Sequence, residues 1–175
     1  EPIVADANSS NIEDFTAGCD LILDGTDNFE IRYLINDLAV KNSIPWIYGA
    51  AVASYGATMT IIPTETPCLR CIFPEIPEAG SAPTCDTAGV IMPIISSVSA
   101  IQVSEAIKYL SGNLADLHRS LLQIDVWSTQ FKKIALRGPD TKCPACNERR
   151  FEFLDAERRD FTAVLCGRNA VQISP

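Results

Sequence analysis

The sequence has few basic residues and a clear excess of acidic ones. Its 175 residues contain 14 Lys and Arg against 22 Asp and Glu, for a net charge of −8. Binding to nucleic acid needs clustered Lys and Arg against the phosphates, so this balance argues against a nucleic-acid partner. The densest basic cluster, which includes Arg149 and Arg150, is interleaved with Glu148 and Glu152. We interpret it as a solvated face.

Long apolar runs are also lacking. No run approaches the roughly 20 apolar residues that span a bilayer. The first residues have neither the basic nor the apolar region of a secretory signal. We therefore expect a cytoplasmic protein without a membrane partner. With 47% apolar and 21% charged residues, the composition is that of a globular domain with a hydrophobic core.

A dinucleotide-binding motif is missing as well. None of the nine glycines forms a G-x-G-x-x-G loop, and His118 is the only histidine. Together these absences argue against an NAD-dependent dehydrogenase. We expect His118 to be exposed in a connector, and no Cys-His pair can be argued from its spacing.

The apolar pattern alternates between strand and helix periods. Strands are expected at residues 2–6, 20–24, 44–52, 55–62, 120–126 and 130–136, with a small terminal strand pair within 162–168. A helical turn is expected at 12–17, and helices at 28–42 and 90–110. Asp27 or Asn28 is expected to cap the 28–42 helix. The proline-rich residues 63–87 are expected to form a long surface loop. The order predicts an α/β fold, a mixed, doubly wound Rossmann-like sheet with antiparallel edge strands.

Two C-x-x-C pairs are the strongest chemical signal in the sequence. They are Cys68 with Cys71 and Cys143 with Cys146. Each turn can point two sulfurs at one ion, and two turns complete a tetrahedral shell of four thiolates. We predict a structural zinc site, because four thiolates leave no open position for a substrate. The alternative is two unrelated buried or redox pairs, which the matched spacing disfavours.

The remaining cysteines are single. Cys85 lies in the long loop just before the 90–110 helix, where a helix N-terminus can make a thiol more acidic. It is a candidate nucleophile, although single loop cysteines are more often inert. Cys19 and Cys166 flank or occupy apolar strands and are predicted to be small core residues.

An acidic stretch follows the strand at residues 20–24. Ligands of open α/β sheets bind beyond the carboxyl ends of strands, and here that edge carries Asp24 and Asp27, followed by Arg32 and Asn36. Carboxylates can hold Mg²⁺ against nucleotide phosphates, and an arginine can neutralise their charge. A helix cap followed by a solvated helix face explains the same residues equally well.

Taken together, these motifs resemble the MoeB/ThiF/HesA family of adenylyltransferases, which activate ubiquitin-like proteins. T-C-D-T-A-G-V at residues 84–90 and E-A-I-K-Y-L-S-G at 105–112 add to the resemblance. It covers roughly residues 1–147 as the C-terminal part of the adenylation domain, with 148–175 as a short extension. The implied activity is ATP-dependent adenylation of the C-terminal glycine of a Gly-Gly-ended sulfur carrier, of the thiamine or molybdopterin type. A homodimer is also implied.

The resemblance also implies roles for individual residues. Asp27 matches a magnesium-binding aspartate, and Cys85 matches a loop cysteine that joins covalently to the carrier in some members. The implied nucleotide site includes Asp24, Asn28, Arg32 and Asn36, and the implied zinc ligands are Cys68, Cys71, Cys143 and Cys146.

One departure from the family concerns the phosphates. The family's Gly-rich phosphate loop is not in the sequence, so we expect a fragment that is inactive alone. The alternative function is a non-catalytic, zinc-stabilised module that binds a ubiquitin-like tail.

Overall fold

The computed structural model describes residues 1–77, 83–156, 162–165 and 170–173. The helices are α1 (Ile12–Thr16), α2 (Phe29–Asn42), α3 (Leu69–Ile72), α4 (Cys85–Ala88), α5 (Met92–Leu110) and the 3-10 helix η1 (Leu114–Asp116). The strands are β1 (Ile22–Leu23), β2 (Trp46–Val52), β3 (Tyr55–Ile61), β4 (Ser120–Asp125), β5 (Gln130–Ala135), β6 (Thr162–Leu165) and β7 (Ala170–Ile173).

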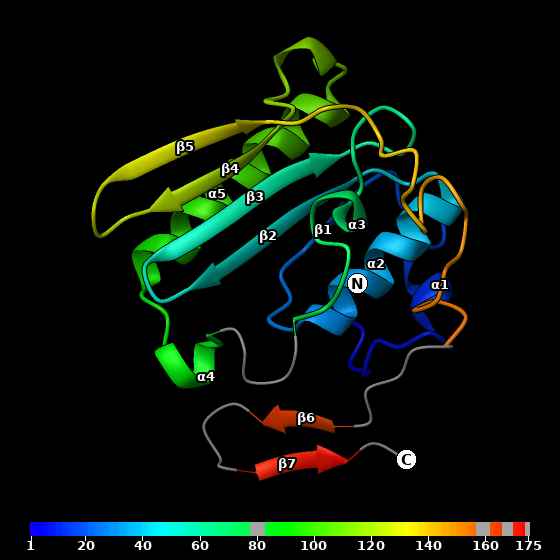
Figure 1. The fold of residues 1–175 in the computed structure, drawn as a ribbon, viewed down its shortest axis with the longest axis horizontal. Coiled ribbons are helices and arrows are strands. Elements are labelled where there is room, and N and C mark those ends of the chain that lie inside the picture. The colour runs from blue at the N-terminus through cyan, green and yellow to red at the C-terminus, as the bar shows by residue number, and fades with distance from the viewer. Residues whose placement is uncertain (78–82, 157–161, 166–169, 174–175) are drawn as a thin grey trace.

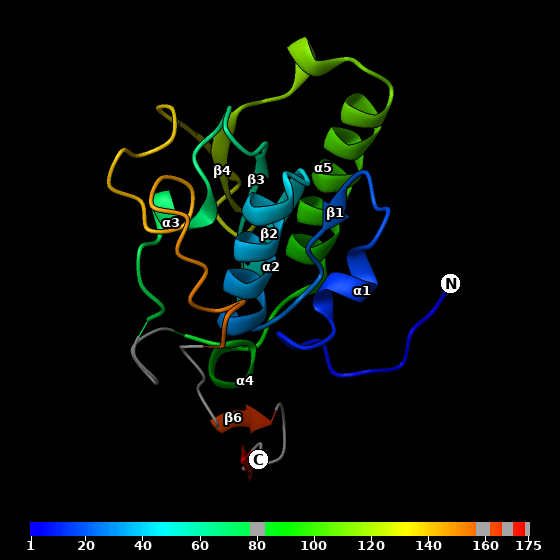
Figure 2. The same ribbon diagram turned by 90° about the vertical axis from the view of Figure 1, so that its right-hand side faces the viewer.

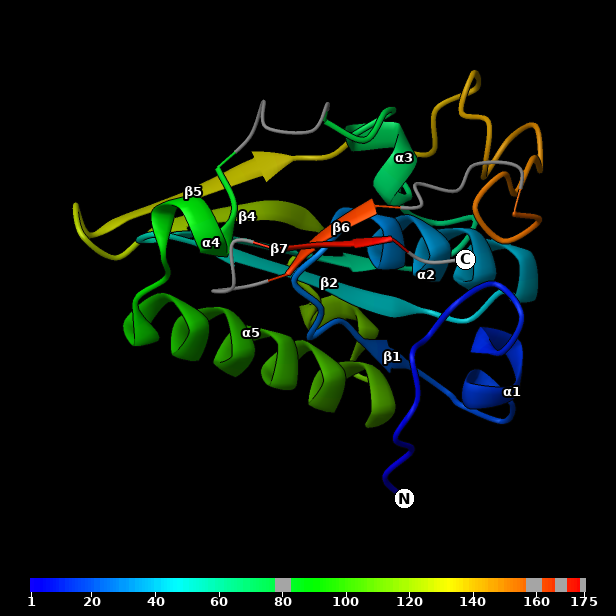
Figure 3. The same cartoon turned by 90° about the horizontal axis from the view of Figure 1, so that it is seen from below.

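A mixed sheet in the order β1-β2-β3-β4-β5 forms the centre of the fold (Figure 1). β1 runs parallel to β2, with α2 as the connection, and the remaining neighbours are antiparallel. Figure 3 shows α5 along one face of the sheet, and α2 with α3 over the other. β6 and β7 pair antiparallel with each other. The predicted mixed α/β sheet with antiparallel strands is therefore confirmed.

Two apolar clusters hold these layers together. The larger lies between the sheet and α2 and includes Leu38, Trp46 and Met59. The smaller lies under α5 and includes Ile94 and Ile124. α5 approaches the sheet so closely that a Cβ on Gly56 would lie 2.6 Å from a methyl of Val98, which is why glycine is needed in β3.

The segment that follows the second cysteine pair packs onto the larger cluster. Phe151, Phe153 and Leu154 are all buried there. The Phe153 ring lies 5.0 Å from that of Tyr33 in α2. The first part of the expected extension thus shares the core of the residues before it.

Four expectations from the sequence are wrong, one of them the exposure of His118. Residues 2–6 form no strand and are exposed, because no described strand lies beside them to complete a ladder. Figure 2 shows this N-terminal segment leading away from the helices. Cys19 is exposed in the turn after α1 rather than in the core; Cys166 lies outside the described residues. Residues 66–70 of the expected surface loop are buried, because they pack against α2.

The part of the chain that the structure describes contains no helix both long and apolar enough to cross a membrane.

Candidate functional site

Asp24 directly follows β1 and organises the turn there. Its side chain is fully buried. One carboxylate oxygen accepts from the amide (2.8 Å) and the hydroxyl (2.7 Å) of Thr26. The other accepts from Arg32 Nε (3.2 Å) and the Gly49 amide (3.3 Å). A carboxylate has about four acceptor positions, so these four donors leave Asp24 little capacity for an added cation.

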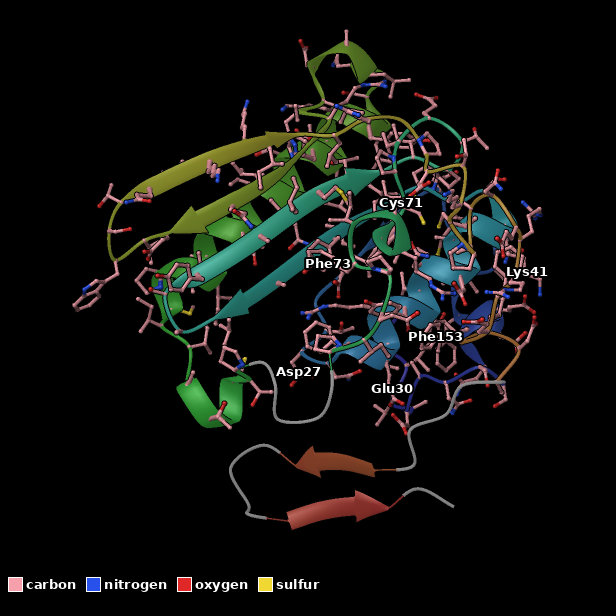
Figure 4. The ribbon with its side chains drawn as sticks, in the orientation of Figure 1. Asp27, Glu30, Lys41, Cys71, Phe73 and Phe153 are labelled. Carbon is pink, nitrogen blue, oxygen red and sulfur yellow. The ribbon has the colours of Figure 1, made fainter. Side chains whose placement is uncertain are left out.

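Asp27 and Asn28 follow at the start of α2. Both are exposed, and the Asn28 side chain caps the helix by accepting from the Ile31 amide at 2.9 Å. The predicted N-cap is confirmed as Asn28. Asp27 therefore projects at the carboxyl end of β1, where Figure 4 shows it beside the first turn of α2. Of the two aspartates in this turn, Asp27 is the one a cation in solvent can reach.

Arg32 is turned inward, toward Asp24. It is 6% exposed, and one of its terminal nitrogens donates to the main-chain oxygens of Thr26 and Gly49. Its guanidinium also lies 5.7 Å from the centre of the Tyr48 ring. The arginine thus offsets the Asp24 charge and holds the turn, while the nucleotide contact that the resemblance implies stays a prediction.

Gln102 of α5 was missed at the level of the sequence. Its side-chain amide nitrogen donates to the main-chain oxygens of Asp24 (2.9 Å) and Ile47 (3.0 Å). The side chain crosses Gly49 so closely that a Cβ there would lie 2.6 Å from Gln102 Cδ. The available signal was its spacing, four residues after Val98 and four before Ala106, which puts a polar side chain on the apolar face of the helix.

Asn36 lies further along α2 and faces the first C-x-x-C turn, residues 68–71 at the start of α3, which we call the first cysteine hairpin. Its side-chain oxygen accepts from the Leu69 amide at 2.8 Å. From the same face, the Tyr33 hydroxyl lies 2.9 Å from the main-chain oxygens of both Phe73 and Glu75. Burial raises the pKa of Tyr33 to about 12, so it remains a donor. Asn36 therefore supports the hairpin, and its predicted contact with a nucleotide is untested.

Cys85 begins α4, whose N-terminus is closed by a capping box between Thr84 and Thr87. The Cys85 thiol donates to the main-chain oxygen of Ala51 at 3.5 Å. Ala51 follows Gly49 by two residues on β2, and Gly49 binds Asp24. A strand rises about 3.3 Å per residue, so the two contact points are about 7 Å apart. The structure thus brings Cys85 and the acidic turn to the same end of the sheet.

The four paired cysteines meet beside α3. All four sulfurs lie within 4.8 Å of one another. The separations are 3.7 Å for Cys68–Cys71, 3.5 Å for Cys68–Cys143 and 3.4 Å for Cys71–Cys146. Four sulfurs about 2.3 Å from one zinc ion would lie about 3.8 Å apart. The Asp140 amide also donates to the Cys71 sulfur at 3.4 Å. This donor set fits a tetrahedral metal ion and is too widely spaced for disulfides.

Contacts among the sulfurs lower the pKa of two of these thiols, Cys71 and Cys143, and raise the pKa of the other two, Cys68 and Cys146. The pKa of the Cys143 thiol is lowered, chiefly by hydrogen bonding from Cys146 and then from Cys68. The pKa of Cys68 is raised, first of all by its hydrogen bond with Cys143. A charged sulfur is the form that binds a metal ion.

Arg70 lies between the ligands of the first hairpin, and its side chain is only 1% exposed. It forms an ion pair with Glu152 (3.0 Å) and stacks over the Phe153 ring (5.4 Å). Nearby, Asp37 accepts from the Phe153 amide at 3.0 Å. Burial raises the pKa of Asp37 to about 6. We refer to residues 149–155 as the clasp, because they lie across both α2 and α3.

His118 is not exposed, contrary to the prediction. Its side chain is 8% exposed and lies 3.7 Å from the Glu105 carboxylate. Burial lowers the His118 pKa, although Glu105 opposes the shift. Burial also works against ionisation of Glu105, but hydrogen bonds from Lys108 and the His118 amide outweigh it and lower that pKa. The Glu105 carboxylate also accepts from the main-chain amide of His118 at 3.1 Å, and this bond fixes the connector between η1 and β4.

Comparison with known proteins defines the family. The ThiF family profile matches residues 1–145. The chain belongs to the ThiF family.

Among the curated relatives is the "Sulfur carrier protein ThiS adenylyltransferase" of Bacillus subtilis. It is 41% identical over 172 residues, which are 98% of this chain and 50% of that protein. The "SAMP-activating enzyme E1" of Haloferax volcanii is 39% identical over 85% of this chain and 54% of its own length. The chain thus spans about half the length of these relatives.

Solved structures share the fold at low identity. The Escherichia coli MccB complex with ATP aligns with a TM-score of 0.65 and 16% identity, over 82% of this chain and 45% of MccB. A second MccB complex, with AMPCPP and MccA, gives a TM-score of 0.66 at 15% identity, over 82% of this chain and 44% of that one.

Proposed function

We propose that the protein containing this chain adenylates the C-terminal glycine of a ubiquitin-like sulfur-carrier protein with ATP. The observation that carries the proposal is the 41% identity to the ThiS adenylyltransferase, which extends over 98% of this chain. The carrier is of the thiamine or molybdopterin type, with a Gly-Gly terminus. Its terminal carboxylate attacks the α-phosphorus of ATP. The new P–O bond gives an acyl-adenylate, and the bond to the β-phosphate breaks to release pyrophosphate.

Asp27 is the residue that holds Mg²⁺ against the nucleotide. It is exposed at the carboxyl end of β1, where ligands of such sheets bind. Mg²⁺ would offset the charge of the leaving pyrophosphate. Three further residues support this site. Asn28 caps α2, Arg32 fixes the turn at Asp24, and Asn36 holds the first cysteine hairpin.

The four cysteines hold a structural zinc ion. Their sulfur separations suit tetrahedral coordination, and a shell of four thiolates leaves no position for a substrate. The ion would join the α3 hairpin to residues 143–146, which otherwise belong to distant parts of the sequence.

Cys85 is the acceptor of the activated acyl group. Its thiolate would attack the carbonyl carbon of the acyl-adenylate, form a thioester and release AMP, with the thiol proton lost to solvent. Support comes from its place at the same end of β2 as the acidic turn.

The protein is a cytoplasmic homodimer in this proposal. α5 supports the dimer because Val103, Ile107 and Leu110 are 50%, 63% and 60% exposed. An exposed apolar stripe of this kind on one helix marks an interaction surface. Their exposure leaves the interface as their proposed role.

The test is ATP–pyrophosphate exchange by the full-length protein with a Gly-Gly-ended carrier. Asp27→Ala should reduce exchange by at least about 100-fold, the scale of losing a key transition-state charge contact. Asp20→Ala, which removes another exposed carboxylate before β1, should leave exchange within about twofold. No exchange from folded wild-type protein with any such carrier would refute the proposal.

A further inference from the structure

The ladder between β1 and β2 stops at Asp24. The Asp24 amide donates to the Ile47 carbonyl at 3.0 Å, as in a parallel pair. The next amide on β2, that of Gly49, instead donates to the Asp24 carboxylate at 3.3 Å. The main-chain carbonyl of Asp24 therefore loses the partner that a continued ladder would provide, and a buried carbonyl needs another donor.

Gln102 is that donor. Its amide nitrogen lies 2.9 Å from the Asp24 carbonyl oxygen and 3.0 Å from that of Ile47. One side chain on α5 thus uses both of its N–H groups on the two neighbouring strands at the point where they separate. The residue is 6% exposed, so water cannot readily replace these bonds.

Gly49 makes room for this arrangement. A Cβ at that position would lie 2.6 Å from Gln102 Cδ and 2.8 Å from Gln102 Oε1. The side-chain amide of Gln102 therefore packs directly against the main chain of β2 at Gly49. The close fit fixes the position of α5 relative to the end of β1.

The direction in which the chain leaves β1 decides where Asp27 lies. Asp24 is bound on its carboxylate by four donors and on its carbonyl by Gln102. Asp27 follows only three residues later, just before the α2 cap. Without the Gln102 bonds, the main chain at Asp24 would keep only the bond from its amide to the Ile47 carbonyl.

We propose that Gln102 is a positioning residue, which holds the end of β1 so that the turn presents Asp27 to the metal–nucleotide complex. The inference rests on the proposed adenylation, because Asp27 holds Mg²⁺ against the nucleotide only in that reaction. A side chain on the far face of the sheet thereby sets the geometry of the acidic turn. In this role Gln102 acts through the turn and not on the nucleotide or the carrier.

The first measurement does not depend on activity. Amide hydrogen exchange would be compared in the full-length protein for wild type, Gln102→Met and Glu105→Gln. Methionine keeps the length of the side chain but removes both donors. Glu105 is a matched control, since it is buried in the same helix but binds Thr60, Lys108 and His118. Exchange of the Thr26 amide, which donates to the Asp24 carboxylate at 2.8 Å, should rise about tenfold in Gln102→Met, the scale of at least one of the two lost hydrogen bonds, and stay unchanged in Glu105→Gln.

The second measurement is pyrophosphate exchange as a function of Mg-ATP concentration. Gln102→Met should raise KM about tenfold with a smaller change in kcat, whereas Glu105→Gln should leave KM within twofold even if it lowers Tm. Unchanged exchange of the Thr26 amide, or an unchanged KM in a folded and active Gln102→Met protein, would overturn the inference. A wild-type protein with no pyrophosphate exchange would instead refute the adenylation proposal, and with it the part given to Gln102.

Discussion

Replacement of Glu152 by alanine tests whether the clasp holds the cysteine hairpin. Glu152 is 12% exposed and forms an ion pair at 3.0 Å with Arg70, whose side chain is 1% exposed. Among the described residues, Nε and Nη1 of Arg70 have no hydrogen-bond partner. The Glu152→Ala variant would therefore leave a guanidinium buried with most of its donors unmatched.

The expected cost follows from that burial. Removing one partner of a buried ion pair costs about 3 to 5 kcal/mol, because the other charge stays in a dry environment. The Phe153 ring over Arg70 and the nearby Asp37 carboxylate remain in the variant. We therefore expect the lower end, a loss of about 3 kcal/mol in the free energy of unfolding.

Urea unfolding of the metal-loaded protein measures this loss. Glu65→Ala is the control, because its ion pair with Arg119 has a similar length (3.3 Å) but is 45% and 49% exposed. That variant should lose less than about 1 kcal/mol. Adding Arg70→Met to Glu152→Ala should recover part of the loss, since no buried charge remains. A loss for Glu152→Ala no larger than for Glu65→Ala would refute the reasoning.

Three further changes test other parts of the structure. Gly49→Ala should destabilise by about 1 to 3 kcal/mol through overpacking, and Gln102→Ala in the same chain should relieve that strain; additive losses in urea titrations would contradict this. Burial raises the Asp37 pKa from 3.8 to about 6, so its neutral form stabilises the fold below pH 4 and that contribution is lost as pH rises through 6. The free energy of unfolding of Asp37→Asn should therefore rise by about 3 kcal/mol relative to that of the wild type as pH goes from 4 to 7. Curves of unfolding free energy against pH that run parallel for the two proteins would contradict this. Removal of the metal by a chelator should lower Tm markedly in wild type but not in Cys143→Ser; a wild-type Tm that does not change on chelation would rule this out.

Features encoded over short distances were predictable from the sequence. The α2 helix followed from apolar spacing and from Asn28 as its cap, and the C-x-x-C turns followed from cysteine spacing alone. The match between two such turns was enough to predict that they meet. Their partner residues in the fold, such as Asn36, were not predictable in that way.

Features that depend on distant contacts could not be read from local pattern. The Gly49 amide reaches Asp24 across 25 residues, and Gln102 reaches it across 78. His118 was misplaced for the same reason, because its burial depends on Glu105, 13 residues earlier. A polar residue on the apolar face of a helix marks such contacts but does not identify the partner.

The cysteine cluster also bears on how the chain is connected. The contact between Cys68 and Cys143 joins residues 75 apart. An ion bound there would close a ring that contains α4, α5, β4 and β5. Closing a loop of this length restricts the unfolded chain by about 4 kcal/mol in the chain-entropy treatment of cross-links. A single backbone cut within the ring, for example at the exposed turn around Gly112, would leave one particle held together by the metal. Chelation would then remove the last link between its two pieces besides their packing.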